Sequence, residues 1–424
     1  MRRFAGKGLT MTEPLAPPKR KDPTKRTRLP LLPSGARSRT SQLLTLAAAE
    51  GRFALSACHD CGAVHYPPRD ACPQCLSPRL GLKDVSPLGK LIAATTIHTS
   101  TDPYFRERMP WRIGTVALDA GPSVIAHLHG DVSEGCGVRL AWTLDKSGQA
   151  VAMALPLKDT PNMADDRQLR ELTLDPKHRR ALVTDGRTAV GQAVVHALAK
   201  ASAAIIFVGL ADQWKPTPGS DALAKLNGVE IVPLDVTNTG SVDELASAIG
   251  GKVDILINTA EYLRPGGMLD RKGIAVARDE LDSGYLGLLR LAQAFGPSLR
   301  FRGADGVNNA CAWVNVLSVY AQMNWPAYGA HSANQAAMLS AAQSLRAELR
   351  PGGVRVINVF TGPLETEWYQ TVPPPKVTAA QVAASIIDAL QRGLEDVYVG
   401  DIAEDVRARL AVNPKAIERE LGTP

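Results

Sequence analysis

The chain has 424 residues, 45% of them hydrophobic, which is enough to bury the cores of two or three domains. Its formal net charge of +6 is unevenly spread, because residues 1–40 contain 11 Lys/Arg and 2 Asp/Glu, while the remainder contains 37 and 40. No apolar run approaches the roughly 18 residues of a membrane helix, and the N-terminus has no signal-peptide core. These features argue against a membrane or secreted protein and predict a soluble, cytoplasmic one.

Residues 1–40 are rich in Pro, Lys and Arg and lack hydrophobic periodicity, so we expect a disordered basic tail. A tail of this composition is most simply a solvated segment. The alternatives are an arm on an acidic partner, a nucleic-acid contact or a phosphate-attracting segment. Nucleic acid is not expected, because no aromatic residues are interleaved to stack on bases.

Residues 41–53 predict a helix that ends near Gly51, and a cysteine-rich segment follows it. Two CxxC pairs are separated by ten residues, and their members are Cys58, Cys61, Cys72 and Cys75. Two such pairs place four thiolates around one metal ion, which predicts a structural Zn²⁺ site; iron in a rubredoxin-like cage and an empty site are the alternatives. Cys136 and Cys311 fall outside this pattern and are expected to be buried thiols.

Five short β-rich runs follow, at residues 89–100, 113–121, 123–130, 137–144 and 149–156, and their spacing predicts a small closed barrel. The ordered combination over residues 41–156 resembles the zinc-ribbon and OB-fold family of small partners of thiolases and related acyl-CoA enzymes. That resemblance implies contact with such an enzyme or with acyl-CoA. An OB-fold by itself also suits single-stranded nucleic acid or oligosaccharide, but the barrel segment has few basic residues and no regular aromatic platform.

Residues 157–177 are polar, have Pro near both ends and are predicted to be a linker. Beyond them, residues 178–424 alternate apolar strands with amphipathic helices. The first unit is HRRALVTDGRTAVGQAVVHALAKASAAIIFVGL, a strand, turn, helix and strand. This alternation predicts a Rossmann-type, doubly wound parallel sheet in a multidomain chain.

The segment VNVLSVYAQMNWPAYGAHSANQAAM (314–338) runs from strand through loop to helix. It resembles the catalytic segment of short-chain dehydrogenases/reductases, in which a Ser is followed thirteen residues later by Tyr-x-x-x-Lys. Here Ser318 keeps its place, while His331 and Gln335 stand where the family has Tyr and Lys. A competing alignment places Tyr328 in the tyrosine's role, with Ser332 in place of the lysine. That alignment shortens the spacing from the Ser to ten residues, so we prefer the first.

In the family, the Tyr hydroxyl exchanges a proton with the substrate, and the Lys lowers its pKa and holds the nicotinamide ribose. Gln335 carries no charge, so it cannot lower a neighbouring pKa in this way. His331 can act as a general acid in principle, although a polar residue in a disused pocket is the simpler interpretation.

The phosphate turn of the family, TGxxxG[IL]G, reads TDGRTAVG here, from Thr184 to Gly191. Glycines are needed there so that backbone N–H groups can approach a pyrophosphate. Gly186 and Gly191 are present, but Asp185 and Ala189 replace two family glycines. Our hypothesis is that the Asp185 carboxylate fills the anion site in place of the pyrophosphate.

Other family positions are partly retained. Gly209-Leu210, at the end of the second strand, lies where the family has an acid that selects NAD or a base that selects NADP, so neither preference is indicated. Glu261 replaces a family glycine, and Gly284 replaces the active-site Asn. The resemblance assigns cofactor contacts, weak or vestigial, to Asp235, Asn258, Ala260, Gly362 and Thr366, together with Thr184, Gly186 and Gly191. Each retained residue also has a structural explanation at a strand end or turn.

Two functions are compatible with the sequence. The first is a non-catalytic or weakly catalytic acyl-CoA-associated subunit that assembles, as a homo- or hetero-oligomer, with a thiolase- or aldolase-type enzyme or an active dehydrogenase. The second is an NAD(P)-dependent oxidoreductase of 3-hydroxyacyl- or 3-ketoacyl-CoA, with His331 as proton donor. Family helices equivalent to residues 275–297 and 327–349 usually form a dimer interface, and both segments remain apolar here.

Overall fold

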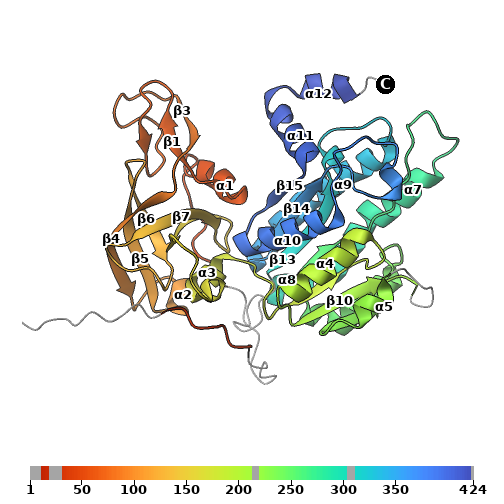
Figure 1. The fold of residues 1–424 in the computed structure, drawn as a ribbon, viewed down its shortest axis with the longest axis horizontal. Helices are drawn as coiled ribbons and strands as arrows, with labels where there is room; N and C mark the ends of the chain where they lie inside the picture. The colour runs from red at the N-terminus through yellow and green to blue at the C-terminus, as the bar shows by residue number, and fades with distance from the viewer. Residues whose placement is uncertain (1–10, 19–30, 213–218, 303–310, 422–424) are drawn as a thin grey trace, which may run out of the picture. The chain divides into compact units, whose positions relative to one another are not determined.

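The computed structural model describes residues 11–18, 31–212, 219–302 and 311–421 (Figure 1). They form two compact units, the first built mainly from residues 31–175 and the second mainly from residues 176–421. Residues 1–10 and 19–30 of the predicted basic tail lie outside the described residues. Within the described ranges, no helix is both long enough and apolar enough to span a bilayer.

The first unit begins with α1 (Gln42–Ala49), which buries Leu44 and three alanines. A three-stranded antiparallel ribbon follows, in the order β2-β1-β3, with β1 (Ala54–Cys58), β2 (Val64–His65) and β3 (Leu80–Asp84). The next five strands close into a barrel in the order β4-β5-β6-β8-β7. They are β4 (Leu88–Ile97), β5 (Trp111–Leu118), β6 (Ser123–Leu128), β7 (Gly137–Leu144) and β8 (Ala150–Pro156). The predicted zinc ribbon and small barrel are thereby confirmed.

Part of the segment predicted as a linker is folded. It contains the short turn η1 (Met163–Asp165) and the helix α3 (Arg167–Leu172). The Asp166 side chain caps α3 by accepting the Leu169 N–H at 2.8 Å. Leu169 and Leu172 pack with Met153 and Leu155 of β8, so this helix belongs to the barrel unit. Within α3 itself, two leucines three residues apart are the apolar signal, and the other four residues are polar.

Glu171 of α3 joins three segments of the first unit. Its Oε2 accepts the hydroxyl of Tyr104, in α2 (Pro103–Arg106), at 3.0 Å. The same oxygen lies 3.0 Å from Arg108 Nε and 2.9 Å from Lys146 Nζ. One carboxylate therefore holds the loop between β4 and β5, the turn between β7 and β8, and α3.

The second unit is a seven-stranded parallel sheet in the order β11-β10-β9-β12-β13-β14-β15. Its strands are β9 (Arg180–Val183), β10 (Ile205–Leu210), β11 (Val229–Pro233), β12 (Ile255–Asn258), β13 (Ala312–Ser318), β14 (Arg355–Thr361) and β15 (Asp396–Val399). Its helices are α4 (Ala189–Lys200), α5 (Ser220–Ala224), α6 (Thr239–Ile249), α7 (Ala275–Leu281), α8 (Gly287–Arg302), α9 (Gly329–Leu349), α10 (Ala379–Arg392), α11 (Asp401–Val412) and α12 (Pro414–Leu421). Short turns add η2 (Gly250–Lys252), the π-turn η3 (Asp282–Leu286), η4 (Val319–Ala321), η5 (Arg350–Gly352) and η6 (Glu367–Tyr369). This is the predicted doubly wound Rossmann-type sheet.

The main core of the second unit joins α6, α8 and α9 to the sheet, with Trp313, Phe295 and Phe360 among its fully buried side chains. β13 and β14 pair in parallel over seven residues, from Ala312 opposite Arg355 to Ser318 opposite Thr361. Because the strands are parallel, their carboxyl ends lie along one edge of the sheet. That edge is where ligands bind in folds of this type.

We predict that Glu171→Gln lowers the stability of the first unit at pH 7 by about 2–3 kcal/mol, because Arg108 and Lys146 lose their counter-charge. Burial raises the pKa of Glu171, but Lys146 and Arg108 outweigh it and lower that pKa from 4.5 to about 2. The carboxylate therefore stabilises the fold above about pH 4.5, and this contribution is lost as the pH falls towards 2.

Thermal unfolding followed by tryptophan fluorescence between pH 7 and pH 3 measures this dependence. The wild type should lose more stability than Glu171→Gln over that range. The exposed Glu134→Gln serves as control and should follow the wild type. Parallel pH profiles for the wild type and Glu171→Gln would contradict the prediction.

Candidate functional site

The four cysteines predicted as metal ligands lie together in the ribbon. Their sulfur atoms are all within 4.8 Å of one another, with 3.6 Å between Cys58 and Cys75 and 3.5 Å between Cys61 and Cys72. A tetrahedral zinc site with bonds of about 2.3 Å has edges of about 3.8 Å, so this donor set fits Zn²⁺. Four sulfur ligands leave no open position, so the metal supports the fold and does not take part in catalysis.

Cys58 and Cys72, the first cysteine of each knuckle, favour the thiolate form. Backbone hydrogen bonds, foremost from Cys61 for Cys58 and from Cys75 for Cys72, lower the pKa of these two thiols. A backbone hydrogen bond from Ser77 lowers the pKa of Cys75, but hydrogen bonding with Cys61 and burial outweigh it and raise that pKa to about 12. The amides of Asp60 and Gln74 lie 3.4 Å from the sulfurs of Cys58 and Cys72. Cys136 and Cys311 lie outside the cluster; Cys311 is buried, as predicted, whereas Cys136 is only partly buried.

At the strand edge of the second unit, the predicted cofactor residues of two strands meet. Thr184, which follows β9, donates its hydroxyl to Asn258 Oδ1 of β12 at 2.9 Å. Its Oγ1 also accepts the Thr259 N–H at 3.0 Å, and the Ala260 N–H lies 3.4 Å from Asn258 Oδ1. Thr184 and Asn258 are both buried, so these residues fix the ends of the two central strands whether or not a ligand binds.

The turn after Thr184 is closed by its own side chains. Asp185 Oδ1 accepts the Arg187 N–H at 2.8 Å, and the Arg187 guanidinium contacts both carboxylate oxygens, at 3.0 and 2.8 Å. Thr188 caps α4 by accepting the Gly191 N–H at 2.9 Å. Two backbone donors of the phosphate turn are thus already bonded within the chain.

The turn is also rich in negative charge. The hydrogen bond to Asp185 raises the pKa of Arg187, and the charges of Asp212 and Asp235 add to the effect. One guanidinium therefore stands among three carboxylates, so a second anion entering the turn meets net repulsion. Asp235 already uses Oδ1 to accept the Thr237 N–H and hydroxyl, at 2.9 and 2.7 Å.

Two glycines of the turn, Gly186 and the family glycine Gly191, are needed for steric reasons. A side chain at Gly186 would collide with Val208, and one at Gly191 would collide with the Asp185 carbonyl. Helix α4 therefore still packs closely against β9 and β10, as the family turn requires. On the opposite side of the strand edge, Gly362 N–H lies 3.4 Å from the Val399 carbonyl, and Thr366 precedes η6.

The Gln335 side chain is bonded within the chain at the end of β13. Its Oε1 accepts the Ser318 N–H at 2.9 Å, and the residue is 4% exposed. Ser318 in turn caps η4, with Oγ 3.2 Å from the Tyr320 N–H. Ser318 and Gln335 are brought together, as the sequence predicts, but their contact is a structural one at the strand end.

His331 is buried, with 1% of its surface exposed, and neither ring nitrogen makes a hydrogen bond within the described part of the chain. Its Nε2 lies 3.9 Å from Glu261 Oε1. Burial lowers the pKa of His331 to about 3, so the imidazole is neutral at pH 7. Burial of the carboxyl group and the charge of Glu280 raise the pKa of Glu261 to about 7, although its side chain keeps 35% exposure.

Tyr328, the alternative proton donor, is 2% exposed and donates its hydroxyl to the Trp368 carbonyl at 2.8 Å. Its ring stacks between Trp325 and Tyr369, with centroid distances of 4.5 and 5.2 Å. Burial raises its pKa, whereas a catalytic Tyr needs the opposite shift. Ser332, the lysine's counterpart in that alignment, accepts the Trp325 N–H at 3.2 Å.

The sequence did not reveal the role of Asn334. Its Oδ1 accepts the Tyr285 N–H of the π-turn at 3.1 Å, and a side chain at Gly284 would collide with its amide nitrogen. Asn334 therefore occupies the space of the Asn that the family carries at position 284. Positions 284 and 334 are 50 residues apart, so no local sequence pattern links Gly284 to Asn334.

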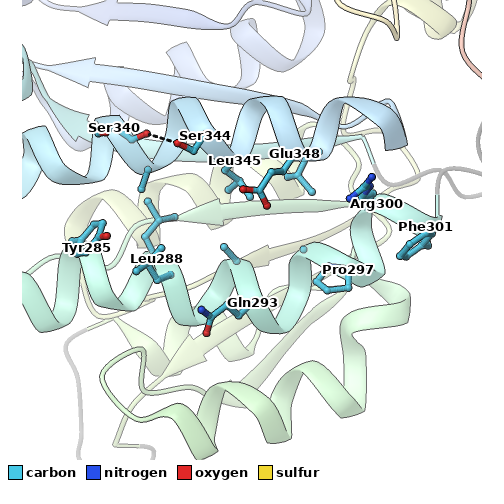
Figure 2. Close-up of a pocket in the computed structure, with 15 residues that line it drawn as sticks. Tyr285, Leu288, Gln293, Pro297, Arg300, Phe301, Ser340, Ser344, Leu345 and Glu348 are labelled. Carbon is cyan, nitrogen blue, oxygen red and sulfur yellow. Dashed lines mark hydrogen bonds between the residues drawn. The ribbon is translucent and has the colours of Figure 1, made fainter.

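A groove of about 510 Å³ lies between α8 and α9, away from the strand edge (Figure 2). Small and apolar side chains line it, among them Leu288, Ala292, Gly296, Ala341, Ser344 and Leu345. Arg300 and Glu348 stand at one end (Figure 2). Small residues on both helices leave room for another helix to approach closely.

We predict one zinc ion per chain. Replacing the exposed Cys61 with Ala removes a ligand without opening a core cavity, so zinc content should fall below about one tenth and the first unit should melt at lower temperature. Cys136→Ala, outside the cluster, is the control and should keep its zinc. Elemental analysis with thermal melting measures both. Full zinc occupancy in Cys61→Ala, or the absorption of an iron–thiolate centre in the wild type, would contradict this assignment.

Comparisons with known proteins identify both units. Residues 186–397, half of the chain, match the family model described as enoyl-(acyl carrier protein) reductase. Residues 47–81 match the ChsH2 rubredoxin-like zinc ribbon domain, and residues 82–143 match the ChsH2 C-terminal OB-fold domain. The chain therefore joins a ChsH2-type zinc ribbon and OB-fold to a reductase domain.

Among curated proteins, the short-chain dehydrogenase ptmH of Penicillium ochrochloron is 31% identical over 202 residues, 44% of this chain and 70% of ptmH. The short-chain dehydrogenase fogD of Aspergillus ruber is 29% identical over 245 residues, 55% of this chain and 73% of fogD. A crystal structure of a short-chain dehydrogenase from Burkholderia cenocepacia in complex with NADP is 31% identical, covers 58% of this chain and 98% of its own, and superposes with a TM-score of 0.52. With the strand-edge geometry described above, these matches establish that the chain belongs to the short-chain dehydrogenase/reductase family.

Proposed function

We propose that this protein is a non-catalytic or weakly catalytic subunit of acyl-CoA metabolism, in which the reductase domain serves assembly. The observation that carries the proposal is the closed phosphate turn. The Asp185 carboxylate already accepts the Arg187 amide and pairs with the Arg187 guanidinium, where a pyrophosphate would need free donors. If a pyrophosphate opened this ion pair, the Asp185 carboxylate, which is only 5% exposed, would lose its counter-charge in a buried position.

The proton-transfer side of the strand edge supports the same conclusion. A working reductase needs a group that donates a proton near neutral pH. His331 is buried and neutral, with its pKa lowered to about 3 by burial, and the Tyr328 hydroxyl is engaged by a carbonyl. Gln335 supplies no positive charge and is bonded to the Ser318 amide.

The runner-up is an NAD(P)-dependent oxidoreductase of a 3-hydroxyacyl- or 3-ketoacyl-CoA, with His331 as proton donor and Ser318 polarising the carbonyl. It is favoured by the retained pairing of Thr184 with Asn258 and by the NADP bound to the Burkholderia relative. This reading requires both the Asp185–Arg187 pair to open and His331 to gain a proton in a buried position.

A cofactor titration separates the two functions. We expect calorimetry with NADH and NADPH to show no saturable binding to the wild type up to about 1 mM. The double variant Asp185→Gly/Ala189→Gly restores the two family glycines and should bind at least about tenfold more tightly, because it removes one carboxylate and frees backbone donors.

Acetoacetyl-CoA reduction provides the second readout. The wild type should show no turnover above background. Micromolar cofactor affinity in the wild type, together with turnover that is lost in His331→Ala but kept in the exposed control His196→Ala, would replace our proposal with the oxidoreductase.

Assembly through the α8–α9 groove is the second part of the proposal. The groove lies away from the strand edge, and its lining combines small and apolar side chains with polar ones such as Gln293, Arg300 and Glu348, which suits pairing with another reductase-type domain. That domain belongs either to a second copy or to an active dehydrogenase subunit. The ChsH2-type unit is proposed to bind a thiolase- or aldolase-type enzyme or its acyl-CoA.

We predict that Ala341→Arg, which places a charge in the groove, dissociates this assembly into single chains. Ala411→Arg, on the exposed side of α11, is the matched control and should assemble like the wild type. Mass photometry of the chain, alone and co-expressed with an active short-chain dehydrogenase, measures the result. Assemblies that survive Ala341→Arg unchanged would locate the interface elsewhere.

A further inference from the structure

The N-terminal segment of residues 11–17 is extended and belongs to the first unit. Thr12 donates both its N–H and its hydroxyl to Asp131 Oδ1, each at 2.7 Å. Leu15 donates its N–H to Asp165 Oδ2 at 3.1 Å, and the Asn162 side chain donates to the Thr12 carbonyl at 3.3 Å. These contacts join residues separated by more than 100 positions in sequence.

The two receiving carboxylates are buried, with 7% of Asp131 and 6% of Asp165 exposed. Asp131 Oδ2 accepts the hydroxyl of Thr160, so one carboxylate ties residue 12 and residue 160 together. Burial raises the pKa of Asp131, but the hydrogen bonds from Thr160 and Thr12 outweigh it and leave the pKa lowered. The carboxylate is therefore an ionised acceptor, which makes stronger hydrogen bonds than a neutral one.

The loop that carries Asp131 is held independently of the N-terminal segment. The Arg112 guanidinium donates to the carbonyls of His129, Gly130 and Val132, at 2.6 to 2.9 Å. The Gly130 N–H is bonded to Asp166 Oδ2 at 2.9 Å. A side chain at Gly130 would approach both Thr12 Oγ1 and Asp166, so glycine leaves room for the segment. The receiving surface is thus preformed.

The segment itself adds little apolar burial. Met11 is 52% exposed, and Glu13, Pro14, Ala16 and Pro17 are exposed as well. Pro14, which has no N–H, stands between the two residues that donate theirs, and its ring restricts the chain to an extended path. Affinity therefore comes from hydrogen-bond donors at residues 12 and 15, and a contact of this kind can open without disrupting a core.

We propose that residues 11–15 form a displaceable strap that Asp131 recognises through the amide and hydroxyl of Thr12, and that pins loop 129–132 to loop 160–165. When the strap is released, both carboxylates lose donors, while the direct bonds from Thr160 to Asp131 and from Gly130 to Asp166 continue to join the two loops. Any group added to Thr12 Oγ1, such as a phosphoryl group, removes the donor and brings charge against Asp131, Asp165 and Asp166, so it holds the strap open. This proposal is independent of the one for the reductase domain.

Hydrogen–deuterium exchange of residues 11–17 in the full chain tests the proposal. Thr12→Val keeps the shape but removes the hydroxyl, and should raise the exchange rate of the segment about tenfold or more. Thr12→Asp should raise it further, Thr12→Ser should restore near wild-type protection, and the exposed Glu13→Gln is the control. Equal exchange in the wild type and Thr12→Val, or Thr12→Ser behaving like Thr12→Val, would overturn the proposal.

Binding in trans provides a second measurement. A fluorescent peptide with the sequence of residues 10–18 should bind saturably to a chain that lacks residues 1–17. The same peptide with Val in place of Thr12 should bind at least about tenfold more weakly. Equal binding of both peptides would exclude recognition through the Thr12 hydroxyl, and it would do so without reference to any reductase activity.

Discussion

The ion pair between Asp185 and Arg187 is the interaction that determines how the phosphate turn of the second unit is occupied. In a Rossmann-type turn, the helix N-terminus and nearby amides attract an anion, and that anion is normally supplied by a cofactor. Here the Asp185 carboxylate accepts the Arg187 N–H and pairs with the Arg187 guanidinium at 2.8 Å, and we propose that it takes the place of that anion. The turn keeps its shape because Gly186 and Gly191 still allow α4 to approach β9 and β10.

Several other polar groups at the strand edge are also bonded within the chain. Gln335 bonds the Ser318 amide, and Asn334 fills the space beside Gly284 and bonds the π-turn. Tyr328 stacks with Trp325 and Tyr369 and bonds a carbonyl. Buried polar groups that are satisfied internally stabilise a fold. His331 is the exception, because both its ring nitrogens lack hydrogen bonds within the described residues.

The sequence was sufficient for features that depend on local spacing. The CxxC pairs gave the metal cluster, and the alternation of apolar runs gave the barrel and the parallel sheet. It was insufficient for contacts between distant segments. Glu171, Asn334 and Thr12 are ordinary polar residues in sequence, and their roles depend on partners 25 to 150 positions away. Helix α3 was missed because its polar composition outweighed two leucines.

The two units share one polypeptide, and this covalent connection near residue 175 has a consequence for stoichiometry. Separate proteins must find each other by diffusion and can accumulate in unequal amounts, whereas fused domains are synthesised one to one. A short connection also keeps the tethered domain at an effective concentration in the millimolar range. Any enzyme captured by the ChsH2-type half consequently has a reductase-type neighbour within reach, even when the direct affinity between those two is weak.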